Sequence, residues 1–199
     1  MKIRIIVLVQ ARSDSRRLPR KVLKNILGKP MIIHQLQRVS KSKYLDELIL
    51  VTSDESSDNI LGETVLHYGF KLFRGDKNNV LKRFFDAVAH LKLKEDDVIV
   101  RLTGDCPLHD SVIIDESIKQ YLKEDCDYLA NCIKPIYPDG FDVEVFSFKS
   151  LETAYLNASK TSQLEHVTPY IRDCGLFIVE NLRKNKIIIR PITLRKKKI

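Results

Sequence analysis

The chain has 199 residues, of which 44% are hydrophobic and 30% are charged, as in an ordinary soluble globular protein. Its net charge of +8 comes from a basic tail, because residues 183–198 hold eight basic residues and no acidic one. The rest of the chain is therefore balanced in charge, which argues against a nucleic-acid-binding body and predicts no specific nucleic-acid partner. With no internal repeat or linker before the tail, we expect one domain over residues 1–182, followed by the tail at 183–199.

The cysteines indicate a reducing environment. Cys106, Cys126, Cys132 and Cys174 form no C-x-x-C pair, so their spacing fits neither a zinc site nor a small disulfide framework. We therefore expect a cytoplasmic location. The amino-terminal apolar run is interrupted by Arg4 and soon followed by basic residues, so it is too short for a signal-peptide core or a transmembrane helix. No membrane insertion is predicted.

The first element is an apolar run followed directly by a basic loop. Residues 3–9 are rich in β-branched side chains, which is typical of a strand buried on both faces. Residues 12–21 then contain a single acid, Asp14, and five cations: Arg12, Arg16, Arg17, Arg20 and Lys21. So many cations at the carboxyl end of a buried strand favour a polyphosphate ligand, while a basic surface loop without a ligand is the alternative.

The following elements alternate between strands and helices. Further strands are expected at residues 47–54, 71–75, 97–105, 127–132, 143–148 and 176–182. Helices are expected from Pro30 onward and at residues 55–68, 79–93, 111–123, 148–159 and 163–172. This βα alternation predicts an α/β protein with a three-layer α/β/α, Rossmann-like fold and a mostly parallel sheet, whose ligands bind beyond the carboxyl ends of the strands.

A candidate metal ligand ends the strand at 97–105. Asp105 follows Gly104, which permits a close approach of the backbone, and its carboxylate is expected at the same rim as the basic loop. Proteins typically hold Mg²⁺ by one or two carboxylates, and phosphate oxygens and water complete the coordination. We therefore expect Asp105 to be a magnesium ligand, although a simple turn after the strand is an alternative.

Four ordered motifs resemble the cytidylyltransferases that make CMP-activated acidic sugars, the acylneuraminate and CMP-Kdo cytidylyltransferase family, and above all its SpsF-like branch of spore coat polysaccharide biosynthesis. The motifs are Gln10-Ala11-Arg12-x-x-Ser15-x-Arg17-Leu18-Pro19-x-Lys21, RLTGDCPL (101–108), YPDGFDVEVFS (137–147) and EHVTPYI (165–171). Asp14 and Arg20 depart from the first motif, because the family often has glycine at these places. If either backbone has a positive φ, the cost is about 1 kcal/mol.

The resemblance implies a nucleotide-diphospho-sugar transferase (GT-A-like) fold and the transfer of CMP from CTP to an acidic sugar or sugar phosphate. Pyrophosphate is released, and the product serves cell-surface polysaccharide or glycan biosynthesis. The implied catalytic residues are Arg12, Lys21 and Asp105, with Asp105 also holding the Mg²⁺ cofactor. The expected partners are CTP and the acidic acceptor, and a homodimer is left open.

The implied binding residues fall into two sets. The nucleotide-binding set is Ala11, Arg12, Ser15, Arg17, Lys21, Ser53, Thr103 and Gly104, whereas Arg16 and Arg20 are expected to be solvated. The acceptor-binding set is Asp139, Asp142, Glu144, Glu165 and His166. From sequence alone, Asp139 also fits a Pro-Asp-Gly turn and His166 also fits a helix-start residue without a ligand.

Two alternatives remain. A GT-A-type glycosyltransferase would use a D-x-D motif, and Asp125-Cys126-Asp127 is one, but it lies before a strand instead of at a strand's carboxyl end. A truncated, non-catalytic nucleotide-binding relative is the second. Family members continue into a Trp-Thr-x-Asp-like motif thought to supply a second metal contact, whereas this chain has no Trp and no acid after Glu180. We expect the tail after about residue 182 to be loosely held.

Overall fold

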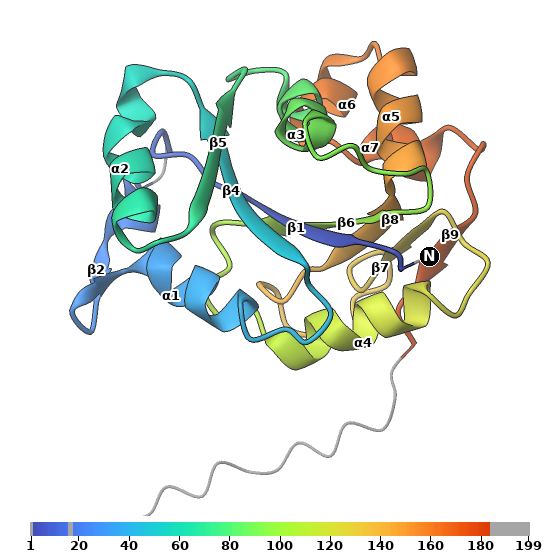
Figure 1. Ribbon diagram of the computed structural model, residues 1–199, viewed down its shortest axis with the longest axis horizontal. Coiled ribbons are helices and arrows are strands. Elements are labelled where there is room, and N and C mark those ends of the chain that lie inside the picture. Colours follow the sequence, from blue (N-terminus) through green and yellow to red (C-terminus); the bar gives the residue numbers. More distant parts are fainter. Residues whose placement is uncertain (1, 16–17, 184–199) are drawn as a thin grey trace, which may run out of the picture.

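The computed structural model describes residues 2–15 and 18–183, whose strands form a seven-stranded sheet and a separate two-stranded ribbon (Figure 1). The order in the large sheet is β5-β4-β1-β6-β8-β7-β9. Only β8 runs against its two neighbours in this part of the chain, and the remaining pairs are parallel. The mostly parallel sheet expected from the βα alternation is therefore confirmed.

The strands are β1 (Ile5–Gln10), β2 (Asn25–Ile26), β3 (Lys29–Pro30), β4 (Glu47–Ser53), β5 (Lys71–Gly75), β6 (Val98–Thr103), β7 (Tyr128–Ala130), β8 (Glu144–Ser147) and β9 (Val179–Asn181). The α-helices are α1 (Met31–Val39), α2 (Asn59–His67), α3 (Val80–Ala89), α4 (Ser111–Tyr121), α5 (Phe148–Asn157), α6 (Thr161–His166) and α7 (Pro169–Asp173). Two short 3₁₀ helices, η1 (Lys21–Leu23) and η2 (Ser56–Asp58), lie in the connections after β1 and β4.

Helices cover both faces of the sheet. In Figure 1, α1 and α4 lie on one face, and α3, α5, α6 and α7 lie on the other. β1 shows why: Val7 packs into the core on the side of α1 and α4, whereas Leu8 packs into the core on the side of α3 and α5, and both are fully buried. A strand buried on both faces needs this continuous apolar run. The three-layer α/β/α arrangement is confirmed.

The structure departs from the expected elements at three places. The ribbon of β2 and β3 was not expected, because two-residue strands are too short to show a period. The expected strand at 143–148 is β8, which is shorter and antiparallel to β6. The expected helix at 163–172 is two helices, because Val167 has φ +71° and Pro169 starts α7 at a position where the missing N–H costs nothing.

No helix within residues 2–15 and 18–183 has the length and apolar character needed to cross a membrane. The expected loosely held tail lies almost wholly at residues 184–199, outside the described part of the chain.

Candidate active site

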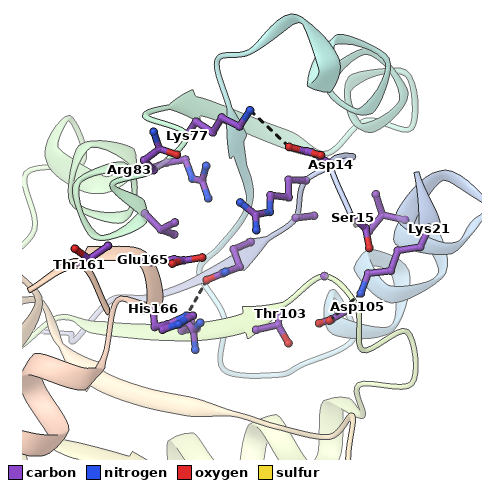
Figure 2. A pocket seen from close by; sticks show the side chains of 18 residues that line it. Asp14, Ser15, Lys21, Lys77, Arg83, Thr103, Asp105, Thr161, Glu165 and His166 are labelled. Atoms are coloured by element: carbon purple, nitrogen blue, oxygen red, sulfur yellow. Dashed lines mark hydrogen bonds and ion pairs between the residues drawn. The ribbon is translucent and has the colours of Figure 1, made fainter. Parts of the chain in front are cut away.

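A cavity of about 960 Å³ opens at the carboxyl ends of β1 and β6 and continues over the sheet to α3 and α6 (Figure 2). It brings together four segments that are far apart in the sequence. The lining includes nine of the residues expected from the sequence, namely Ala11, Arg12, Ser15, Lys21, Thr103, Gly104, Asp105, Glu165 and His166. Ser53, Asp139, Asp142 and Glu144 do not line it, and Arg17 lies outside the described residues.

The floor of the cavity depends on a close approach between the ends of β1 and β6. Gly104 donates its backbone N–H to the carbonyl oxygen of Gln10 at 2.7 Å. A Cβ atom at Gly104 would lie 2.5 Å from Cβ of Ala11 and 2.8 Å from that carbonyl oxygen, so no larger residue fits without moving a strand. The N–H of Ala11 donates to Val51 O at 3.1 Å, and so this donor is not free for a ligand.

The basic loop after β1 is held by a buried carboxylate. Asp58 accepts a hydrogen bond from the backbone N–H of Ser13 at 2.6 Å, and its other oxygen accepts from the hydroxyl and N–H of Ser53. Burial alone would raise the pKa of Asp58, but these hydrogen bonds hold the pKa below its usual value. Ser53 therefore positions the loop through Asp58, a role that sequence reasoning did not identify.

The loop ends in a strained residue. Arg20 has φ +55° and ψ +28° in the left-handed region, whereas Asp14 has no positive φ. Asp14 and Arg20 stand where the family often has glycine, and only Arg20 has the left-handed backbone that is unfavourable for a residue with a Cβ atom. The Arg20 side chain is exposed and does not line the cavity, which agrees with its expected solvation.

Lys21 and Asp105 face each other across the rim of the cavity (Figure 2). Nζ of Lys21 lies 3.0 Å from Oδ2 of Asp105, and the side chains are 28% and 48% exposed. Partial burial would raise the pKa of Asp105, but the hydrogen bond and charge of Lys21 bring the pKa below its usual value. Asp105 is therefore an ionised carboxylate at neutral pH.

Asp105 fits a magnesium site that is completed by a substrate. In the part of the chain that the structure describes, no group of three or more His, Cys, Asp or Glu side chains converges as a preformed metal site. A single rim carboxylate suits Mg²⁺, which commonly takes its other ligands from phosphates and water. The carboxylate is also accessible, because about half of the Asp105 side chain is exposed.

Further polar residues line the cavity that sequence reasoning missed: Gln10, Lys77, Asn78, Arg83, Arg101 and Thr161. Two of them could have been recognised from the sequence, because they are charged residues within apolar patterns. Arg83 interrupts the apolar face of the expected helix at 79–93, and Arg101 interrupts an otherwise apolar strand. A charged residue at such a position needs a partner, which indicates either a buried ion pair or a ligand.

Glu144 is the partner of Arg101. It is 6% exposed and accepts hydrogen bonds from the hydroxyls of Tyr128 and Thr168, each at 2.6 Å, and from Nη1 of Arg101. Burial would raise the pKa of Glu144, but the charge of Arg101 and the two hydroxyl groups lower it below its usual value. Nε of Arg101 donates to Oε1 of Gln10 at 3.1 Å. Glu144 thus holds two cavity-lining residues in place, Arg101 directly and Gln10 through Arg101.

Asp139 and Asp142 lie in the segment that precedes β8. Asp139 is exposed in a turn with Gly140, whose φ is +95°, as the Pro-Asp-Gly alternative describes. The backbone oxygen of Asp142 accepts from Nε2 of the buried His109 at 2.9 Å. Burial lowers the pKa of His109, so the neutral imidazole accepts at Nδ1 from the amide of Gln35. This network holds the segment, and neither acidic side chain lines the cavity.

The D-x-D sequence has a structural role instead of a place at the cavity. The backbone N–H of Asp127 donates to Ile178 O, and its carboxylate accepts from the N–H of Ile178, both at 2.9 Å. These bonds join the start of β7 to the start of β9. Because Asp127 precedes β7, it lies at the end of that strand opposite to where a metal-holding D-x-D is expected.

This fold, with a basic loop and a rim carboxylate at the ends of adjacent parallel strands, is typical of enzymes that bind nucleotides. Residues 6–196 match the cytidylyltransferase family, and the chain therefore belongs to that family. The spore coat polysaccharide biosynthesis protein SpsF of Bacillus subtilis is 33% identical over 174 residues, which cover 85% of this chain and 70% of that protein. The resemblance seen in the four sequence motifs is thereby confirmed.

Further similar proteins include another relative in sequence and two solved structures. An uncharacterized protein of Methanocaldococcus jannaschii is 41% identical over 168 residues, which cover 84% of this chain and 67% of that protein. A solved cytidylyltransferase from Leptospira borgpetersenii superposes with a TM-score of 0.85 and 30% identity over 93% of this chain and 77% of that one. A CMP:2-keto-3-deoxy-manno-octonic acid synthetase in complex with CTP (TM-score 0.67, 18% identity, 89% and 88% coverage) shares the fold.

Proposed function

We propose that the chain transfers CMP from CTP to an acidic sugar or a sugar phosphate and releases pyrophosphate, as a step in making a cell-surface polysaccharide or glycan. The observation that carries the proposal is the pairing of Lys21 with Asp105 at the rim of the cavity. A cation for phosphate and a carboxylate for Mg²⁺ stand side by side there, in a member of the cytidylyltransferase family. The acidic sugar is suggested by a relative named as a 3-deoxy-manno-octulosonate cytidylyltransferase, and the role in polysaccharide biosynthesis is suggested by SpsF.

The triphosphate of CTP would lie along the loop after β1. Arg12 and Lys21 would bind its oxygens, and Ser15 would add a hydroxyl group or a backbone N–H. Lys21 would then exchange its contact with Asp105 for a contact with phosphate. Mg²⁺, when bound by Asp105 and the phosphates, would neutralise part of the charge that develops during transfer.

In the reaction, an acceptor oxygen attacks the α-phosphorus of CTP in line with the bond to the bridging oxygen of the β-phosphate. The new P–O bond forms as that bond breaks, and the electron pair leaves with pyrophosphate. Arg12 and Lys21 stabilise the negative charge on the phosphate oxygens, and positioning does much of the remaining work. A sugar phosphate acceptor attacks through an oxygen that is already anionic, so its attack requires no general base.

The acceptor would occupy the α6 side of the cavity, where Glu165 and His166 are exposed to the cavity. The expectation that Asp139, Asp142 and Glu144 contact the acceptor directly has no support from their positions. Glu144 acts on the cavity through Arg101, and the other two lie in the segment held by His109.

The test is pyrophosphate release with each of the four nucleoside triphosphates, Mg²⁺ and a panel of acidic sugars and sugar phosphates. We expect release with CTP that depends on the acceptor, and a CMP-linked product detected by mass spectrometry. A glycosyltransferase would instead consume a nucleotide sugar and release a nucleotide without pyrophosphate. That result, or equal use of all four triphosphates, would contradict the proposal.

A further inference from the structure

Arg83 is a buried arginine that lines the cavity without a carboxylate partner. Its residue is 2% exposed, and Figure 2 shows its side chain on the other side of the cavity from Lys21 and Asp105. Nη1 donates to the backbone oxygen of Asp76 at 3.1 Å, but the buried Nε has no hydrogen-bond partner among residues 2–15 and 18–183. Within the described residues, Arg83 forms no ion pair, unlike Arg101, which is paired with Glu144.

The acids near Arg83 do not serve as its ion-pair partner. Asp58 contributes most among the acids that stabilise the charged form of Arg83, but its oxygens accept from Ser13 and Ser53. Burial is the main cause that lowers the pKa of Arg83, and the positive charge of Arg12 lowers it further. A guanidinium that has left water without an anion is unfavourable, so this arrangement indicates a missing anionic ligand.

Arg12 is the second free cation of this part of the cavity. Its side chain is exposed, and it forms neither a hydrogen bond nor an ion pair with any residue that the structure describes. It comes from the loop after β1, whereas Arg83 comes from the first turns of α3. Two arginines from different elements thus repel each other through their charges, and no acid in the described part of the chain pairs with either.

We propose that Arg12 and Arg83 together bind the phosphate chain of the nucleotide, as a subsite separate from the pair of Lys21 and Asp105. The inference rests on the proposed function. A phosphate oxygen between the two guanidinium groups would give Arg83 the counter-charge that it lacks and would relieve the repulsion between the two cations. The guanidinium fork suits phosphate oxygens because it presents parallel N–H donors.

Three variants test the proposal by calorimetric titration without acceptor. Arg83→Gln removes the charge, and Arg83→Lys keeps the charge but removes the fork. Lys82→Gln is the matched control, because it is the adjacent residue of α3, loses the same charge, and pairs with Asp86 away from the cavity. Each variant is titrated with CTP and with cytidine, which has the same base and sugar but no phosphate.

We expect Arg83→Gln to weaken CTP binding about tenfold or more, with cytidine binding unchanged, as for the loss of a charge-assisted hydrogen bond. Arg83→Lys should lose less affinity, and Lys82→Gln should match the wild type. Equal losses for CTP and cytidine would mean that Arg83 contacts the base or ribose and would overturn the proposal. Unchanged CTP binding with a raised KM for the acceptor would assign Arg83 to the acceptor and would also overturn it.

Thermal unfolding separates a binding role from a structural one. Without ligand, the Tm of Arg83→Gln should equal or exceed that of the wild type, because an unpaired buried charge is removed. The increase in Tm on adding CTP should be smaller than for the wild type. A lower Tm without ligand and an unchanged CTP effect would show a structural role. If the wild type binds no CTP, the proposed function fails; if all variants bind CTP as the wild type does, only this inference fails.

Discussion

Lys21 and Asp105 are 84 positions apart in the sequence, but Nζ of the first lies 3.0 Å from Oδ2 of the second. The pair joins the loop after β1 to the loop after β6 at the rim of the cavity. Partly exposed ion pairs contribute little to stability, because water and side-chain entropy offset the attraction. A phosphate group would therefore displace the carboxylate from Lys21 at small cost, which would leave Asp105 free for the metal ion that we propose it holds.

Asp105→Asn should abolish magnesium-dependent turnover and leave the fold intact. Half of this side chain is exposed, so its replacement by an isosteric amide removes a metal ligand and no core contact. Pyrophosphate release and circular dichroism on the same sample measure both effects. Asp96→Asn is the control, since Asp96 is exposed just before β6 and outside the cavity. Turnover equal to that of the wild type in the Asp105 variant would end its assignment to the metal.

Arg12→Ala and Lys21→Ala should each weaken CTP binding about ten- to a hundredfold, corresponding to about 1.5–3 kcal/mol for a charge-assisted phosphate contact. Lys24→Ala is the control, because Lys24 is exposed beyond η1 and does not line the cavity. Calorimetric titration at fixed ionic strength measures the three affinities. If the control lost as much affinity as the other two, the attraction would be a diffuse effect of charge and not a site.

Arg20→Gly should stabilise the protein by about 1 kcal/mol. The left-handed backbone of Arg20 is unfavourable for a residue with a Cβ atom and is readily adopted by glycine. Arg20→Ala should give no such gain, because alanine keeps the Cβ atom. Asp14→Gly should give none either, because Asp14 has no positive φ. Urea unfolding of the four proteins is the measurement, and a gain for the alanine variant would point to charge instead of backbone strain.

Glu144→Gln should destabilise the protein by about 3 kcal/mol at neutral pH, because Arg101 loses its buried counter-charge. The folded-state pKa of Glu144 is below its ordinary value of 4.5, so the stabilisation is complete above about pH 4.5. It should fall by about 1.4 kcal/mol for each pH unit between that value and the lower folded-state pKa. Urea unfolding at several pH values compares wild type and variant.

The difference in stability between wild type and Glu144→Gln should thus shrink as the pH falls below 4.5. A difference that stays constant between pH 7 and pH 3.5 would mean that Glu144 titrates alike in both states. Tyr128→Phe is a milder companion variant, since it removes one of the hydroxyl donors to Glu144 and leaves the ion pair in place.

The parts of the fold that the sequence predicts well are those with long, regular patterns. β1 and β6 are apolar runs, and their carboxyl ends are followed by Arg12 and Asp105, so the central rim of the site follows from the parallel arrangement. The antiparallel direction of β8 was not predictable, because alternation in a strand carries no information on its direction. Glu144 was expected at the acceptor from the family resemblance alone, whereas the antiparallel pairing places it opposite Arg101, whose partner it is.

Other residues of the site depend on contacts that no local pattern contains. Ser53 was expected near the nucleotide because it ends β4, but its hydroxyl bonds to Asp58 from the following 3₁₀ helix. Arg83 and Arg101 are visible in the sequence as charges within apolar segments, a pattern that can mark a site. Their different partners, a carboxylate for Arg101 and none for Arg83, appear only in three dimensions.

The contact between Gly104 and Ala11 limits how this cavity can adapt to a ligand. Since a single added methyl group would separate the two central strands, the loops that follow them are fixed to one another at their base. Any adjustment to acceptors of different size must then occur at the outer walls, where α6 carries the exposed Glu165 and His166. Acceptor preference should therefore be changeable by exchanging α6 and its flanking loops while the affinity for the nucleotide is kept.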